Sequence, residues 1–264
     1  MKLKLLSLIG AFATIAIVYT SCKKDAVDYG SKGTTSTVSS KDVTSQIALN
    51  LSQSLFGGLG GFDMSDGLSP KINALAPNHQ KIIINELNPS GCGTLMDTTM
   101  TYSMDIDTTK LSISGRYKIG TVCTAGKPTG LTMYDSLLVA MSTPSLAANY
   151  KIGQNLTITS LNPQNSDSQL SFSGAMKMQT NLQYKTGSKA KFNTLFDYTL
   201  TALIIDPADD ADIKSGSATF HTTGDVPQGK WDYKGTITFL GNHKVKITID
   251  SKTYTVDIQT GLIV

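Results

Sequence analysis

Apolar and polar residues alternate along residues 96–119, a pattern typical of β-strands with one buried face. The apolar positions are even in the first half and odd in the second: Met96, Met100, Tyr102, Met104 and Ile106, then Leu111, Ile113, Tyr117 and Ile119. Two antiparallel strands bring both sets to one face only in a register that pairs even with odd positions. A tight turn at Asp107-Thr108 meets this condition. The pattern therefore predicts a hairpin in which Met104 faces Leu111.

The same register places Cys92 opposite Cys123 near the open end of the hairpin. Facing residues of an antiparallel pair have Cα atoms about 4.5 to 5.5 Å apart, within the range that a disulfide accepts. We therefore expect a Cys92–Cys123 disulfide. A β-bulge that shifts the register would still leave the two cysteines in reach, and the alternative is two separate buried thiols.

A second kind of period precedes the strands, in residues 43–59. Apolar residues recur there every four positions, as on one face of a helix: Val43, Ile47, Leu51, Leu55 and Leu59. Asp42 is expected to cap the start of this helix, and the glycines at 57–58 and 60–61 are expected to end it. So narrow a stripe favours docking on a sheet. A partner-binding or membrane-lying helix is the alternative, although the polar face carries Ser, Gln and Asn rather than lysine.

The longest alternation runs from residue 170 to residue 204 and keeps its apolar residues on even positions: Leu170, Phe172, Met176, Met178, Leu182, Tyr184, Phe192, Phe196, Tyr198, Leu200 and Ile204. Constant parity across a hairpin requires a loop with an odd number of residues, here centred near Ser188. Strands of about fourteen residues exceed the usual five or six. Such lengths with one apolar face indicate a curled antiparallel sheet wrapped around something, for which the helix at 43–59 is the candidate.

The C-terminal residues continue as a meander of short strands. Ile237 and Phe239 are expected to face Ile247 and Val245 across a three-residue loop, 241–243. A turn at Ser251-Lys252 would then bring Ile249 opposite Tyr254 and Ile247 opposite Val256.

The predicted fold is all-β. It is an antiparallel meander of long strands in a twisted or curled sheet, either a sandwich or a half-barrel, with one N-terminal helix docked on it. We expect residues 42–264 to form a single domain whose strands begin at about residue 81, after a loop at 63–80.

The first residues follow a different pattern. Lys2 and Lys4 precede an uncharged apolar run from Leu5 to Val18, and Tyr19-Thr20-Ser21-Cys22 closes it. A run of about fourteen residues is short for a bilayer-spanning helix and fits the h-region of a signal peptide. This segment resembles a bacterial lipoprotein signal with Tyr19 in place of the usual Leu. The stretch Ser-Cys-Lys-Lys-Asp at 21–25 is similar to that of Bacteroidota lipoproteins.

The resemblance implies that residues 1–21 are a signal peptide and that Cys22 carries the lipid, palmitate included, that holds the chain to a membrane. Residues 22–41 are rich in Ser, Thr, Gly and Lys and are predicted to form a flexible tether. The expected location is the cell envelope, at the outer membrane, with the periplasmic or surface side left open. An exported chain with two cysteines besides Cys22 also favours one disulfide.

The net charge, the histidines and the acidic residues limit the kinds of ligand and reaction that the sequence supports. A formal net charge of +3 is no electrostatic footprint for nucleic acid. The three histidines, His79, His221 and His243, lack ligand spacing, and no zinc-protease or serine-hydrolase motif is present. One acidic cluster is a weak candidate for calcium, although its spacing does not match an EF-hand and a solvated acidic turn is favoured: Asp206, Asp209, Asp210 and Asp212.

Two functions follow from these observations. The first is a non-enzymatic binding or structural module that needs no cofactor and whose ligand or protein partner is unknown. The second is a carrier or sensor of an apolar, lipid-like ligand held between the helix and the curled sheet. The methionines on the apolar face favour a ligand surface, or they fill the core. An enzyme, such as a hydrolase, is the third and least favoured interpretation.

Overall fold

The computed structural model describes residues 37–55, 62–63, 69–70, 92–165, 168–206 and 212–264. Contacts divide the chain into two units, Met1–Thr35 and Ser36–Val264, and all described residues belong to the second. The predicted signal peptide, Cys22, Leu59 and the expected start of the strands at residue 81 lie outside the described residues. Within the described part, no helix is long and apolar enough to cross a membrane.

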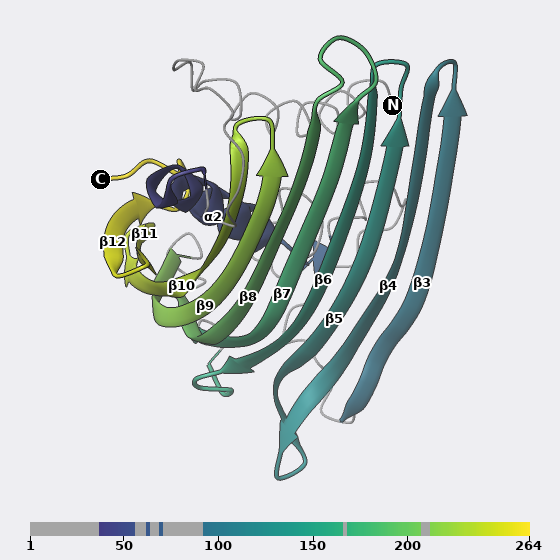
Figure 1. Cartoon of the computed structure of the whole chain (residues 1–264). Coiled ribbons are helices and arrows are strands. Elements are labelled where there is room, and N and C mark those ends of the chain that lie inside the picture. The colour runs from purple at the N-terminus through teal and green to yellow at the C-terminus, as the bar shows by residue number, and fades with distance from the viewer. Residues whose placement is uncertain (1–36, 56–61, 64–68, 71–91, 166–167, 207–211) are drawn as a thin grey trace. The chain divides into compact units, whose positions relative to one another are not determined.

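Ten strands form one antiparallel sheet in the order β12-β11-β10-β9-β8-β7-β6-β5-β4-β3 (Figure 1). Each strand pairs with its neighbours in the sequence, as short connections require. The predicted meander and fold class are confirmed, but the sandwich alternative is wrong because the long strands lie in one sheet rather than two. The strands are β3 (Gly93–Ile106), β4 (Thr109–Thr124), β5 (Lys127–Ser142), β6 (Leu146–Ser160), β7 (Leu170–Tyr184), β8 (Lys191–Asp206), β9 (Asp212–Val226), β10 (Gly229–Gly241), β11 (Lys244–Ile249) and β12 (Lys252–Asp257), and a separate short pair is β1 (Phe62–Asp63) with β2 (Ser69–Pro70).

The one helix among the described residues, α2 (Ser40–Leu55), begins three residues earlier than predicted. The amide of Asp42 donates to the hydroxyl of Ser39 at 3.3 Å, and that hydroxyl donates to the Asp42 carboxylate at 2.7 Å. Ser39 is therefore the N-cap, and Asp42 is its partner three positions on, as in a capping box. The prediction that Asp42 itself caps the helix is wrong.

The residues before the helix belong to the folded unit. The amide of Thr37 donates to the carbonyl of Lys230 at 2.8 Å, and the Tyr233 hydroxyl donates to the carbonyl of Val38 at 2.8 Å. Residues 37–41 were predicted to belong to the flexible tether, but Thr37 and Val38 are held against β10, and Ser40 and Lys41 are part of α2. The rest of that segment lies outside the described residues.

The helix crosses the buried face of the sheet, and the C-terminal strands curl around it (Figure 1). Val43, Ile47 and Leu51 are fully buried and Leu55 nearly so, which confirms the described part of the predicted stripe. Ser40 is hydrogen-bonded to Tyr254 on β12 at 3.0 Å. Near the middle, the Tyr198 hydroxyl on β8 donates to the carbonyl of Ile47 at 3.1 Å. The sheet therefore wraps around this helix, as expected.

The β3–β4 hairpin has the predicted turn and register from Met96 to Ile106, with Met104 opposite Leu111. The register shifts by one residue between Thr94 and Met96, so Gly93 faces Thr121. Cys92 is consequently not directly opposite Cys123, and that detail of the prediction is wrong. The disulfide itself is confirmed, because the Cα atoms lie 6.0 Å apart and the sulfurs are bonded.

The β7–β8 hairpin keeps the predicted even parity, with Leu182 opposite Phe192, and its loop is centred on residue 187 rather than 188. A bulge then interrupts β8 at Ala202, whose φ is 48°. Beyond the bulge, Leu203 and Ile205 are buried in place of Ile204. The prediction for Ile204 is wrong because one extra residue in a strand reverses the faces of those that follow.

The C-terminal meander is confirmed with two corrections to its turns. Asn242 and His243 alone connect β10 to β11, since Gly241 pairs with Lys244. The last turn is Asp250-Ser251, two residues with positive φ of 47° and 64°, as a type I′ turn requires. Ile247 therefore faces Tyr254, and Val256 faces Val245. This slip of two residues leaves every side chain on its predicted face.

Truncating a buried side chain of the helix stripe should destabilise the domain. We expect Leu51→Ala to lower the free energy of unfolding by about 3 kcal/mol, because it leaves a cavity between helix and sheet. Chemical denaturation of Lys41→Ala is the matched control, since Lys41 is an exposed residue of the same helix and its loss should change stability by less than about 0.5 kcal/mol. Equal effects of the two substitutions would contradict the docking of α2.

Removing the disulfide should cost about 3.5 kcal/mol of stability, because the bond closes a loop of 31 residues in the unfolded chain. Cys92→Ser, Cys123→Ser and the double variant should lose equal amounts, since each breaks the same bond. Denaturation with and without a reducing agent provides the control: the reductant should destabilise the wild type and leave the double variant unchanged. Different losses in the two single variants would count against the pairing.

Candidate functional site

A row of polar side chains crosses the buried, apolar face of the sheet at β4, β5 and β6. Asp135 on β5 faces Tyr117 on β4 and Gln154 on β6. Asp135 is 0% exposed, Tyr117 3% and Gln154 4%. Carboxylates and amides are seldom buried to this degree unless they are paired. We call Tyr117, Asp135 and Gln154 the polar row.

The polar row meets the end of helix α2. The Gln154 side-chain amide donates to the carbonyl of Ser54, in the last turn of the helix, at 3.2 Å. Among the described residues, Gln154 Oε1 and both carboxylate oxygens of Asp135 have no hydrogen-bond partner. Since buried polar groups are nearly always hydrogen-bonded, three adjacent acceptors without donors need an explanation.

Burial also changes the pKa of the two titratable side chains of the polar row. Burial raises the pKa of Asp135 to about 7. The pKa of the Tyr117 hydroxyl is raised as well, first by its own burial and then by the charge of Asp135. A carboxyl group with such a pKa marks a candidate functional site, either as a proton-transfer group or as an acceptor that awaits a positive charge.

The side chains on either side of the row along β5 and β6 are apolar. Met133 and Leu137 precede and follow Asp135 on the same face, and Ile152 and Leu156 do so for Gln154; all four are buried. The site is therefore an island of acceptors in an apolar surface. A molecule that satisfied it would combine hydrogen-bond donors with an apolar body.

Asp212, one of the acidic residues singled out from the sequence, has a structural use. Asp212 accepts the amide of Asn242 at 2.8 Å and the amide of His243 at 3.1 Å, and so holds the β10–β11 turn. Burial acts to raise the pKa of Asp212, but these hydrogen bonds outweigh it and the pKa is lowered. Asp206 at the end of β8 faces Asp212 at the start of β9, whereas Asp209 and Asp210 lie outside the described residues. In the described ranges no three acidic, histidine or cysteine side chains form a metal-ion cluster.

The two described histidines, His221 and His243, are not on the strands of the polar row. His221 on β9 contacts Asp232 at 2.8 Å, with both side chains partly exposed. His243 is in the β10–β11 turn, and His79 lies outside the described residues. Neither β9 nor this turn neighbours β5 in the sheet. Neither described histidine is therefore on a strand that adjoins that of Asp135.

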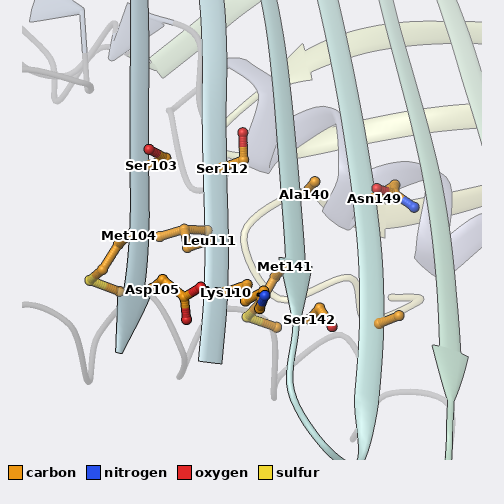
Figure 2. Close-up of a pocket in the computed structure, with 11 residues that line it drawn as sticks. Ser103, Met104, Asp105, Lys110, Leu111, Ser112, Ala140, Met141, Ser142 and Asn149 are labelled. Carbon is orange, nitrogen blue, oxygen red and sulfur yellow. Dashed lines mark ion pairs between the residues drawn. The ribbon is translucent and has the colours of Figure 1, made fainter. Parts of the chain in front are cut away.

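A hollow of about 500 Å³ lies at the far ends of β3, β4, β5 and β6 (Figure 2). Its lining combines Met104, Leu111 and Met141 with small polar residues, and an exposed ion pair joins Asp105 to Lys110 at 3.4 Å. The volume is in the range of ligand sites, but such sites usually enclose their ligand. No residue of α2 lines the hollow, so it is not the space between helix and sheet that an apolar ligand was expected to fill.

Asp135 and Gln154 were not predicted from the sequence as site residues, although a signal was present. In residues 131–139 every second position is apolar except one, and that one is Asp135. Gln154 likewise lies between Ile152 and Leu156 in the apolar register of its strand. A polar residue with the parity of a buried face is the pattern to search for.

Comparison with known proteins places the chain in no family. No family model matches it, and no curated protein or solved structure does so. The candidate site is therefore inferred from the residues of this chain alone.

Asp135 should make stability depend on pH. Its pKa is raised from 3.8 to about 7, so between these values the unfolded chain releases a proton that the folded chain keeps. The free energy of unfolding should therefore fall by up to about 4 kcal/mol as the pH rises from 4 to 8. Asp135→Asn should remove this part of the pH dependence, measured by denaturation at both pH values.

The matched control for this measurement is Asp197→Asn, which removes an exposed carboxylate of β8 that is ion-paired with Lys177. Its pH profile should follow the wild type. If Asp135→Asn shows the same change in stability between pH 4 and pH 8 as the wild type, the carboxyl group does not titrate as described.

Proposed function

We propose that this protein is a lipoprotein of the cell envelope, anchored to the outer membrane through lipid on Cys22, and that its curled sheet is a non-enzymatic binding module. The observation that carries the anchoring is the sequence of residues 1–25, with its basic start, short apolar run and cysteine at the end. The disulfide between Cys92 and Cys123 is consistent with an oxidising compartment.

The polar row supports binding over catalysis. Nucleophilic catalysis requires a nucleophile and a base in contact, and an orienting group behind the base. Asp135 and Gln154 provide acceptors, and Tyr117 beside them has a pKa raised further from neutrality. Such a set holds a donor group more readily than it moves protons.

The second candidate function is that of a carrier or sensor of an apolar ligand. Its ligand would lie at a different place from the one expected from the sequence. Between α2 and the strands β7 and β8, the Tyr198 hydroxyl and the Asn50 side chain make direct hydrogen bonds across the interface. The acceptors at the end of the helix, within the apolar face of β4, β5 and β6, favour that end of the sheet as the ligand surface. A carrier or sensor would hold its ligand there.

Anchoring is tested by metabolic labelling. Cells expressing the wild type and grown with an alkyne fatty acid should yield a labelled protein, because the lipid is attached to Cys22. Cys22→Ala should be unlabelled, whereas Cys92→Ser, which removes a different cysteine, should be labelled like the wild type. Label on the Cys22→Ala protein would refute the anchor.

A further inference from the structure

We propose that the acceptors of Asp135 and Gln154 bind the primary ammonium group of an amphipathic amine, whose apolar part lies on the buried face of β4, β5 and β6. This inference rests on the proposed binding function and specifies the chemical class of its ligand.

The number and charge of the acceptors match this group. Asp135 and Gln154 face each other across the β5–β6 register, where side chains are in direct reach of one another. Together they present three oxygens without donors in the described structure: both carboxylate oxygens and Gln154 Oε1. A primary ammonium has three N–H donors and no acceptor. It is also the charge that a buried carboxylate lacks, since a buried charge without a partner is unfavourable.

The surroundings exclude other kinds of charged ligand. A carboxylate or phosphate headgroup would bring a second negative charge beside Asp135 without supplying a donor. Calcium takes six to eight oxygen ligands, and magnesium requires a nearly octahedral set. The polar row offers one carboxylate, one amide oxygen and the Tyr117 hydroxyl, and the described residues contain no group of three acidic, histidine or cysteine side chains around it. An organic cation is therefore the better match.

The ligand must also be apolar beyond its amine. Met133 and Leu137 on β5, and Ile152 and Leu156 on β6, flank the acceptors on the same face. A small, strongly hydrated cation would lose its hydration shell on this apolar surface, and nothing there would offset that free-energy cost. An alkyl chain attached to the ammonium would instead extend along these side chains.

The test uses the full chain purified from cells and three soluble six-carbon probes: hexylamine, hexan-1-ol and hexanoate. At pH 8 hexylamine should raise the midpoint of thermal unfolding in a concentration-dependent way. Hexan-1-ol should bind at least tenfold more weakly, and hexanoate should give no shift. Asp135→Asn should weaken the binding of hexylamine at least tenfold and leave the binding of hexan-1-ol unchanged. The control Asp197→Asn should bind both probes as the wild type does.

A pH series on the wild type provides a test that needs no variant to fold. The affinity for hexylamine should fall about tenfold for each pH unit below 7, because the free site must first lose the Asp135 proton while the amine stays charged. Tyr117 on β4 is the titratable neighbour across the register, and Gln154 on β6 and Ser54 at the end of α2 are uncharged. The affinity for hexan-1-ol should not change with pH.

Equal affinity for hexylamine and hexan-1-ol, binding of hexanoate, or an amine affinity that is the same at pH 5 and pH 8 would overturn the inference. An Asp135→Asn protein that binds hexylamine like the wild type would do the same. These outcomes are independent of the lipid on Cys22, because fatty-acid labelling reports the anchor and the titration reports the polar row. A chain that carries the fatty-acid label but does not bind hexylamine would refute the proposed ligand class and leave the lipid anchor standing.

Discussion

The contact between helix α2 and the curled sheet is the interaction on which the rest of the structure depends. A sheet of ten strands that alternate apolar and polar residues collects its apolar side chains on one face, and that face must be covered. Ile47 and Leu51 of the helix are fully buried, and Tyr198 ties the helix backbone to β8. Because the helix is narrow and the sheet wide, the C-terminal strands reach the helix by curling around it.

The path of the helix also determines where polar groups become buried. Its start is bonded to Tyr254 on β12 and its last turn to Gln154 on β6, so it crosses the sheet from the C-terminal edge toward the middle. Asp135 lies on the next strand, β5. Among the described residues, the helix end contributes one carbonyl to Gln154, and nothing donates a hydrogen bond to Asp135. A carboxylate kept there without a partner is costly to folding, and such costs are commonly met at functional sites. Binding of a donor-rich ligand accounts for it.

Much of the fold was predictable because alternation depends on local sequence. The parity of Met104 and Leu111, and of Leu182 and Phe192, specifies which residues share a face and that their strands are antiparallel neighbours. Parity cannot distinguish registers that differ by two residues, which is why the Asp250-Ser251 turn was misplaced. Nor does it reveal bulges such as that at Ala202, where one residue reverses the face of all that follow.

The sequence by itself therefore determined the all-β meander, the helix stripe and the pairing of Cys92 with Cys123, because each depends on periodicity or on short separations along one hairpin. The sequence also contained the pattern that marks the site, an aspartate among the apolar positions of β5. Only the tertiary structure decided that Asp135 is buried, that Gln154 lies beside it and that Gln154 bonds to the end of α2. The bond between Gln154 and the helix joins residues 100 positions apart, and no local pattern specifies which strand a helix end will reach.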